Sequence, residues 1–498
     1  MAAISTDETL QPTLYTPGRS RTSPTLRRAD RAVVSRWCYG VTPDLAREVK
    51  AAGSGLDWFE EQLATAYDGR DDVEDWWPAL SADPSSPTVR GADAWDLAAA
   101  YSCSLLARRM TSPHQVLERM TEFWENLLHV PARPDAQVRY RADYGRTIRA
   151  GALGSYADLL TAAICHPAMQ LYLSGNLSAA EHPNENLGRE LLELHTVGVG
   201  NYTEADVKNS ARILTGFTVD PSAATAAGYD PQRHWTGPVT VMAKRAAWPA
   251  PFRSDNADPD GRAVVSDYLG YLARHPATAR RIAQRLAMVF VRDSPPPALV
   301  AELAEVYLAH DTEIVPVLRA LVTSPYLAAS AGAKLRDPAH DLVATHRVLG
   351  SRFARPVDWQ SAANQLYHQL DGIGAAPMTW PSPNGAPIVG APWATPVRAL
   401  VSADVHYSAA GGWFPSAGVT YPDPRRFMPR KKMAFRAWVD HLSRVFLGRR
   451  STRTLLEACC RATGLLPTDV VRRSGSWTGV DFPNLLIVLL DTPAHYYH

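Results

Sequence analysis

The sequence predicts a mainly α-helical protein, a multi-helix globular architecture with a small β-hairpin element and long ordered loops rich in proline and glycine. Apolar residues recur at helical spacing over most of the chain, and residues typical of helix caps precede several of these segments. Two tracts carry too many Pro and Gly residues for any regular element. Of the 498 residues, 46% are hydrophobic and 20% charged, a globular composition that excludes wholesale disorder.

Helices are predicted where a cap precedes an apolar stripe. Ser112, followed by a proline, predicts the start of a helix whose apolar stripe covers residues 116–127. Asn184 predicts the cap of a second helix, and Thr203 with Asp206 predicts that of a third. The same periodicity predicts further helices at 262–274, 276–291, 298–310, 312–322, 338–350, 431–447, 452–463 and 482–491.

The remaining segments predict a strand pair, loops and an arm. Residues 229–242 place Pro and Gly turns around β-favouring valines, which predicts a small hairpin. Residues 372–396 and 408–424 predict ordered loops. The expected organisation has three parts: a mobile N-terminal arm at 1–28, a helical core at 29–350 with the hairpin inserted near 229–242, and a loop-rich helical part at 351–498 packed on the core.

Charge and cysteine usage limit the classes of function. The 51 Lys+Arg and 50 Asp+Glu residues leave a net charge of +1, so no overall field predicts binding to nucleic acid or a membrane. The longest aliphatic run, 485–490, is far shorter than the ~20 residues of a spanning helix. The five cysteines form no Cys-x-x-Cys pair, which favours buried reduced thiols. With no apolar segment after the N-terminal arginines, we expect a cytoplasmic protein.

Four runs are more specific than periodicity: 183–198, 202–206, 211–216 and 230–238. They resemble a large bacterial family, the "domain of unknown function 1800" family. The Phe123-Trp124 pair, the loop at 380–385 and the closing segment 490–493 are similar to its other landmarks. The resemblance covers the chain from about residue 30 to the C-terminus. It implies membership and no activity, because the family has no established reaction.

The sequence departs from that family at one position. Relatives commonly carry an Asn-His step just after the Phe-Trp pair, whereas this chain has Asn126-Leu127 and a histidine two residues later, at His129. If the family's histidine performs chemistry, the departure implies that its role is absent or relocated here. Many relatives also carry export signals, and none is expected in this chain.

The first candidate site contains two carboxylates and a histidine. Glu190 and Glu193 share one helix face, which suits two ligands around one cation or a pair whose repulsion raises one pKa for acid–base work. His195 lies about 140° further round a regular helix than Glu190, and joins the pair only if the helix loosens near its end. These three are the predicted metal ligands, with Arg189 as a substrate-binding residue. The alternative is an ion-paired helix face in which Arg189 and Arg212 neutralise the carboxylates.

The second candidate site lies at the tip of the expected hairpin. His234 is a predicted acid–base catalyst or metal ligand, and Arg233 a predicted clamp for an anion. Trp235 is a predicted substrate contact. In the alternative interpretation, Asp230 only stabilises a turn and Trp235 packs in the core.

The third candidate is a stripe of acidic residues with one histidine on a single helix. Glu118, Glu122, Glu125 and His129 recur at spacings of 4, 3 and 4. Di-iron bundles bind metal with carboxylates and histidines on helices, but they repeat a Glu-x-x-His pair on two helices, which this sequence does not. Because the stripe lies opposite the apolar face, we expect a solvated surface.

Two loop or surface features complete the candidates. Asn384, in the Trp-Pro-Ser-Pro-Asn-Gly loop at 380–385, is a predicted substrate-lining residue, and an ordinary turn is the alternative. The tract 425–453 contains ten Lys and Arg residues, which nucleic-acid binding would show. Its aromatics stand at helical spacing, which favours a core role, so a nucleic-acid partner is not expected.

Two functions stay open. The first is an enzyme that acts on a polar small substrate by metal-assisted or acid–base chemistry, with Glu190, Glu193 and His234 as catalytic residues and a divalent metal as the candidate cofactor. Its cleft would be built by three segments, 184–196, 229–242 and 380–393. The second is a non-catalytic binding or assembly protein that uses the same groove. The sequence has no motif for ATP, dinucleotide or α/β-hydrolase chemistry, and no feature that indicates an oligomeric state.

Overall fold

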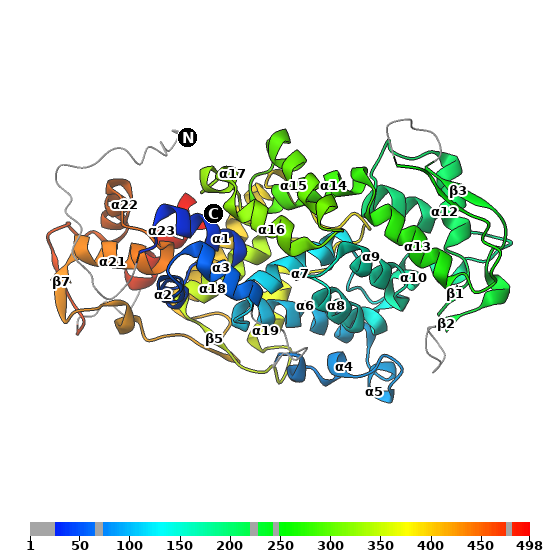
Figure 1. Cartoon of the computed structure of the whole chain (residues 1–498). Coiled ribbons are helices and arrows are strands. Elements are labelled where there is room, and N and C mark those ends of the chain that lie inside the picture. Colours follow the sequence, from blue (N-terminus) through cyan, green and yellow to red (C-terminus); the bar gives the residue numbers. More distant parts are fainter. Residues whose placement is uncertain (1–24, 65–72, 220–227, 243–248, 475–480) are drawn as a thin grey trace. The chain divides into compact units, whose positions relative to one another are not determined.

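The structure is a computed structural model, and it describes residues 25–64, 73–219, 228–242, 249–474 and 481–498. Helices dominate it, and its strands form short antiparallel pairs (Figure 1). The predicted class, mainly α with minor β, is therefore confirmed. Of the predicted arm, 1–24 lies outside the described residues, whereas Leu26 is buried and Arg28 begins the first helix.

The described chain divides into two compact units. Unit 1 combines Met1–Glu61, Ser330–Gln369 and Gly390–His498, and unit 2 combines Gln62–Ala329 and Leu370–Val389. This division does not follow the expected border after residue 350, because the first helices group with the C-terminal ones. Each unit is described below by itself.

Unit 1 contains the first and the last helices of the chain. Its helices are α1 (Arg28–Trp37), α2 (Pro43–Ala52), α18 (Pro338–Leu349), α20 (Pro396–Gly411), α21 (Phe435–Leu447), α22 (Arg453–Thr463), α23 (Asp481–Leu490) and α24 (Pro493–Tyr496). Two helices run across its borders, α3 (Gly55–Ala64) and α19 (Ala362–Asp371). Its strand pairs are β5 (Arg352–Phe353) with β6 (Val419–Thr420), and β7 (Lys432–Ala434) with β8 (Val470–Arg472).

Unit 2 holds the segments in which the sequence places its candidate sites. Its helices are α4 (Pro78–Ser81), α5 (Pro87–Arg90), α6 (Ala94–Thr111), α7 (Gln115–Leu127), α8 (Arg141–Ala150), α9 (Tyr156–Ile164), α10 (Pro167–Tyr172), α11 (Glu185–Glu190), α12 (Glu204–Ile213), α13 (Arg262–Ala273), α14 (Pro276–Phe290), α15 (Pro297–Ala309), α16 (Ile314–Thr323) and α17 (Pro325–Ala329). Its strand pairs are β1 (Phe217–Thr218) with β2 (Gly228–Tyr229), and β3 (Val239–Val241) with β4 (Phe252–Ser254).

Local capping explains where several of these helices begin. Asn184 accepts hydrogen bonds from the first amides of α11, as predicted. Thr203 and Asp206 form the predicted capping box at the start of α12. The prediction at Ser112 is wrong, because α7 starts at Gln115 and the Ser112 hydroxyl accepts the His114 amide within the turn that follows α6.

The predicted hairpin at 229–242 has other partners than expected. Val239–Val241 is a strand, but it pairs with Phe252–Ser254, beyond the expected range. Gly228–Tyr229 pairs with Phe217–Thr218 instead. The reason is the turn at Pro231–Arg233, a short 3-10 helix that separates β2 from β3. Figure 1 shows these strands beside α12 and α13, and α12 packs against β3.

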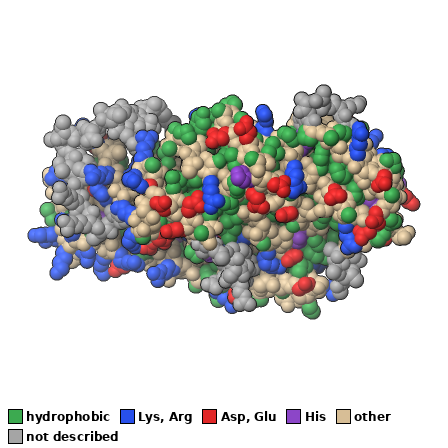
Figure 2. Space-filling model, in the orientation of Figure 1, with side chains coloured by type: hydrophobic (Ala, Val, Ile, Leu, Met, Phe, Trp, Pro, Cys, Tyr) green, Lys and Arg blue, Asp and Glu red, His purple; other side chains and the backbone are tan. Residues whose placement is uncertain are grey.

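The aromatics of the basic tract lie in the core of unit 1, as their helical spacing favours. Phe435, Trp438 and Phe446 are buried on α21, and Phe427 packs against them. Most Lys and Arg residues of the tract lie at the surface, whereas Arg444 pairs with the buried Asp440; Figure 2 shows basic side chains gathered over the part that carries α21 and β7. No helix of the described residues is both long and apolar enough to cross a membrane.

Candidate functional site: a carboxylate pair on a π-helical turn

The site begins where α11 changes its winding. After Glu190 the chain continues as a π-helical turn over Leu191–His195. The Thr196 hydroxyl donates to the Leu191 carbonyl at 2.7 Å, and the amide of Gly198 donates to the Leu192 carbonyl at 2.8 Å. Gly198 has a φ of 84°, a left-handed conformation that favours glycine. The helix thus loosens near its end, and π-helical turns occur frequently at functional sites.

A glycine lets α11 approach α12 closely. A Cβ atom on Gly188 would lie 2.8 Å from both the Ala211 amide nitrogen and the Val207 carbonyl oxygen. Real side chains do not reach that distance from backbone, so the position requires glycine. This contact fixes the face that α11 turns toward α12.

Glu190 and Glu193 lie close together, as their spacing predicts, and both are half-buried. The two side chains differ in their partners, because Glu193 accepts a hydrogen bond from the Tyr202 hydroxyl. The pKa of Glu190 is raised above its ordinary value, first by burial and then by the negative charge of Glu193, against a smaller opposing effect of Arg189. One carboxylate is therefore anchored, and the other is biased toward holding a proton.

Two residues from other helices surround this pair. Arg281 on α14 donates to the Leu194 carbonyl at 3.0 and 3.1 Å, and Glu193 lies within its electrostatic range. Tyr172 at the end of α10 donates to the Pro381 carbonyl at 2.9 Å. Burial and then the charge of Glu190 raise the pKa of Tyr172 to about 12. The sequence did not indicate either residue, since nothing local marks a contact between distant helices.

His195 points into the core rather than toward the carboxylates. Its side chain is fully buried, and its Nδ1 lies 2.9 Å from the Leu127 carbonyl oxygen. Its Nε2 makes no hydrogen bond in the described part of the chain. Burial, outweighing the bond to Leu127, lowers the pKa of His195 to about 4, and Arg281 and Arg285 lower it further. The ring is therefore neutral near pH 7.

The other histidine of interest, His129, lies beside His195. It is buried, its Nε2 is 2.7 Å from the Trp380 carbonyl oxygen, and its charge would act on His195. Burial lowers its pKa to about 4 as well. Leu127 stands where the resemblance expects a histidine, and its carbonyl contacts His195. His129 thus lies in the same neighbourhood as Leu127 and His195.

The loop at 380–385 packs tightly on this region. The Asn126 side chain donates to the Ala386 carbonyl at 3.0 Å. A Cβ atom on Gly385, whose φ is 73°, would lie 2.3 Å from the Asn126 carbonyl oxygen, so only glycine fits there. Asn384, the predicted substrate-lining residue, is exposed on this loop.

The acidic stripe on α7 is buried, so the expected solvated surface is wrong. Glu118 pairs with Arg149 at 2.6 Å, and Glu125 pairs with Arg141 at 2.9 Å. Both pairs are almost fully inaccessible to solvent. Arginines of α8 cover the face that the sequence assigned to solvent. The carboxylates are engaged in ion pairs, which gives no support to a di-iron arrangement.

The hairpin residues are held by structural contacts. His234 is buried, with Nδ1 3.0 Å from the Thr215 carbonyl oxygen and Nε2 3.0 Å from the Asn256 side-chain oxygen. Arg233 donates to the Asn176 carbonyl at 3.0 Å. The ring of Trp235 is half-buried, and the guanidinium carbon of Arg212 lies 4.6 Å from the centroid of this ring. Both ring nitrogens of His234 are thus engaged away from Glu190 and Glu193.

Arg189 is turned away from the carboxylates beside it. It forms a two-pronged ion pair with Glu204 at 2.7 and 2.9 Å, which raises the pKa of Arg189. The ion-paired alternative predicted that it would neutralise Glu190 or Glu193. The ion pair of Arg189 is therefore with Glu204, and its charge opposes the raised pKa of Glu190 only in part.

Ligand atoms that could hold one metal ion converge at another place. Among the described residues, such a group of three His, Cys, Asp or Glu side chains is formed by Asp341, His406 and His495 in unit 1. Glu190, Glu193 and His195 do not form a group of this kind. Of the sequence-predicted ligands, the structure brings together the two glutamates.

Comparison with known proteins assigns the chain to one family. The model of the family described as "Protein of unknown function (DUF1800)" matches residues 32–496. No curated protein and no solved structure matches the chain. Because the match covers nearly the whole sequence, the chain belongs to the DUF1800 family of proteins of unknown function.

Proposed function

We propose that the protein is an acid–base enzyme acting on a polar small substrate, and that Glu190 transfers the proton. The observation that carries the proposal is the half-buried pair of Glu190 and Glu193, in which burial and then the charge of Glu193 raise the pKa of Glu190. Catalytic acids and bases need a pKa near the working pH, and burial with a like-charged neighbour moves a carboxyl group in that direction.

The two carboxyl groups have different roles in this proposal. Glu193 is held by the Tyr202 hydroxyl and lies within the electrostatic range of Arg281, which supports a fixed position for orienting a polar substrate. Glu190, without such an anchor, gives or takes the proton. Pairs of carboxyl groups whose environments differ are a recurrent arrangement for acid–base chemistry.

The buried surroundings would hold this pair in place. His195 and His129 stay neutral and bond to backbone carbonyls, so they fix the π-helical turn and the 380–385 loop rather than carry protons at neutral pH. His234 is not used in the proposal, because both of its ring nitrogens are engaged. Tyr172 lies near Glu190 and supplies a neutral hydroxyl at neutral pH.

We also propose the cytoplasm as the place of action. The five cysteines form no disulfide bond in the described part of the chain, and burial raises the pKa of Cys103 and of Cys459 because it disfavours the thiolate. A reducing compartment preserves such thiols.

The test follows the proton on Glu190 by ¹³C NMR of side-chain-labelled glutamate, with the signal assigned by its loss in Glu190→Gln. We expect Glu190 to titrate above the usual range near 4.3 and to return toward it in Glu193→Gln, which removes the like charge. Glu185→Gln is the matched control, because Glu185 is exposed on the same helix. An ordinary pKa for Glu190 in the unmodified protein would contradict the proposal.

A second measurement separates function from structure. Chromogenic esters, amides and glycosides form a panel of polar substrates, and we expect turnover to fall at least a hundred-fold in Glu190→Gln but not in Glu185→Gln. Glu190→Gln should unfold at the same temperature or slightly higher, because it removes a repulsion. If the variant mainly loses stability, Glu190 is a structural residue and the chain is better explained as a binding protein.

A further inference from the structure

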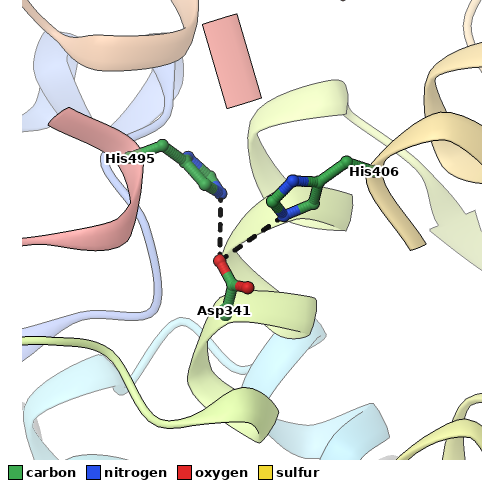
Figure 3. Close-up of side chains that lie close together, drawn as sticks. All are labelled: Asp341, His406 and His495. Atoms are coloured by element: carbon green, nitrogen blue, oxygen red, sulfur yellow. Dashed lines mark ion pairs between the residues drawn. The ribbon is translucent and has the colours of Figure 1, made fainter. Parts of the chain in front are cut away.

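Three buried side chains converge in unit 1, apart from the carboxylate pair of unit 2. Asp341 on α18, His406 on α20 and His495 on α24 offer one ligand atom each, and these atoms lie within 4.8 Å of one another. Figure 3 shows both rings turned toward the Asp341 carboxylate. All three side chains are at most 2% exposed. The group therefore lies where an unsatisfied polar atom is costly.

The spacing of these atoms matches ligands around a metal ion better than direct hydrogen bonds. Nε2 of His406 and Nε2 of His495 each lie 3.5 Å from the same atom, Asp341 Oδ1. Charge-assisted hydrogen bonds are shorter, at about 2.7–2.9 Å. Two ligands bound about 2.1 Å from one zinc ion at tetrahedral angles stand about 3.4 Å apart.

Two of the converging atoms contact each other at 3.5 Å but have no hydrogen bond of normal length among the described residues. In the part of the chain that the structure describes, Asp341 Oδ1 and His406 Nε2 make no hydrogen bond. Leaving buried donors or acceptors unbonded costs about 1–3 kcal/mol each, more for charged groups. A cation between them would satisfy both.

The remaining polar atoms of His406 and Asp341 make hydrogen bonds that orient the side chains, as is usual for metal ligands. His406 Nδ1 lies 2.7 Å from Asp491 Oδ1, and because a carboxylate accepts, this nitrogen donates; in the neutral ring that binds a metal, Nε2 then has the lone pair. The other oxygen of Asp341, Oδ2, accepts the Ser402 hydroxyl at 2.7 Å and lies 3.4 Å from Arg398. These bonds orient the carboxylate so that Oδ1 faces the rings.

We propose that Asp341, His406 and His495 bind one divalent transition-metal ion, and that zinc is the best match. Two imidazoles and one carboxylate are a zinc ligand set, and the 3.5 Å spacing fits its tetrahedral geometry. Thr345 Oγ1 lies 3.0 Å from His495 Nε2, so a hydroxyl stands next to this ligand atom. Because the ligands are buried, the ion is structural and joins three helices of unit 1. This proposal does not depend on the acid–base function.

The first experiment titrates the metal directly. The full chain without a histidine tag is stripped with a chelator, dialysed and titrated with zinc chloride by calorimetry. We expect one zinc ion per chain and a melting temperature several degrees higher in excess zinc, because an ion that binds only the folded state stabilises it. A stripped protein that binds no zinc overturns the proposal.

Matched variants then test the ligands. Asp341→Asn removes the charged ligand, and Asp440→Asn is its control, because Asp440 is equally buried in unit 1 but pairs with Arg444 at 2.8 Å. We expect zinc binding to weaken at least a hundred-fold in Asp341→Asn and to persist in Asp440→Asn. Asp491→Asn, which weakens the support of His406, should lose roughly ten-fold. Equal zinc affinity in Asp341→Asn and the parent chain overturns the assignment.

A measurement on the unmodified chain covers the case in which Asp341→Asn does not fold. X-ray absorption at the zinc edge should show two imidazole ligands at about 2.0–2.1 Å and light-atom neighbours without sulfur. A first shell that contains sulfur, or fewer than two imidazoles, places the zinc elsewhere and overturns the proposal.

Discussion

His275 shows how one buried side chain ties stability to pH. It caps α14, and its Nδ1 accepts the Ala277 amide at 3.2 Å. The side chain is 1% exposed, and burial lowers its pKa to about 4. Protonation of Nδ1 would turn this acceptor into a donor and break its hydrogen bond with the Ala277 amide. The folded state therefore disfavours the protonated ring.

The prediction at this residue concerns acid sensitivity. Because the folded pKa lies below the ordinary value near 6.5, the unfolded chain binds the proton more tightly, and the contribution of His275 is complete above about 6.5 and is lost as the pH falls toward 4. His275→Asn keeps a capping acceptor that does not titrate. We expect its free energy of unfolding, measured in urea, to match the parent at pH 7.5 and to fall by about 1–2 kcal/mol less than the parent's between pH 6.5 and 4.5. Parallel pH profiles would contradict this.

Residue-level prediction from the sequence succeeded where the relation is local. Glu190 and Glu193 meet because they are three positions apart on one helical face. The burial of Glu118 and Glu125 was missed, since it depends on arginines of α8 that the sequence does not connect with α7. Side chains from distant segments likewise complete the metal-ligand group, and no spacing along the chain indicates it.

At the scale of elements, caps were predictable and strand pairing was not. The caps at Asn184 and Thr203 involve bonds within three residues, so the sequence carries the full signal. The partner of Val239–Val241 is fixed by packing around α12, which no local pattern encodes. The π-helical turn was predictable only in part. The sequence indicated that His195 would approach the carboxylates only if the helix loosened near its end, and the helix does loosen there. The sequence did not indicate that the His195 ring would point into the core.

The close approach of α11 and α12 yields a prediction at Gly188. Gly188→Ala places a Cβ atom 2.8 Å from backbone atoms of α12, so one helix must move. The steric clash costs stability, and the higher helix propensity of alanine offsets a small part of that cost. We expect a net loss of about 2 kcal/mol in the free energy of unfolding. The matched control is Gly154→Ala, whose Cβ would meet its nearest atom at an ordinary 3.6 Å. Denaturant unfolding measures both variants, and an equal effect of the two would refute the close contact.

At the scale of the molecule, the chain builds two units from interleaved segments. Each unit has apolar residues that pack among themselves: Leu485 belongs to the cluster around α21 and α23 in unit 1, and Leu105 to a cluster of unit 2. The sequence predicted a sequential division instead, because composition changes along the chain and does not reveal which distant segments share a core.

Separate cores predict separate unfolding. Proteins with more than one unit commonly depart from two-state behaviour, so calorimetry should resolve more than one transition. Leu485→Ala and Leu105→Ala each remove buried methyl groups, which costs about 2–5 kcal/mol in the unit concerned. We expect Leu485→Ala to lower the temperature of one transition and Leu105→Ala that of another. If both substitutions lower a single shared transition equally, the two units unfold as one cooperative body, since a loss in either core then destabilises the whole chain.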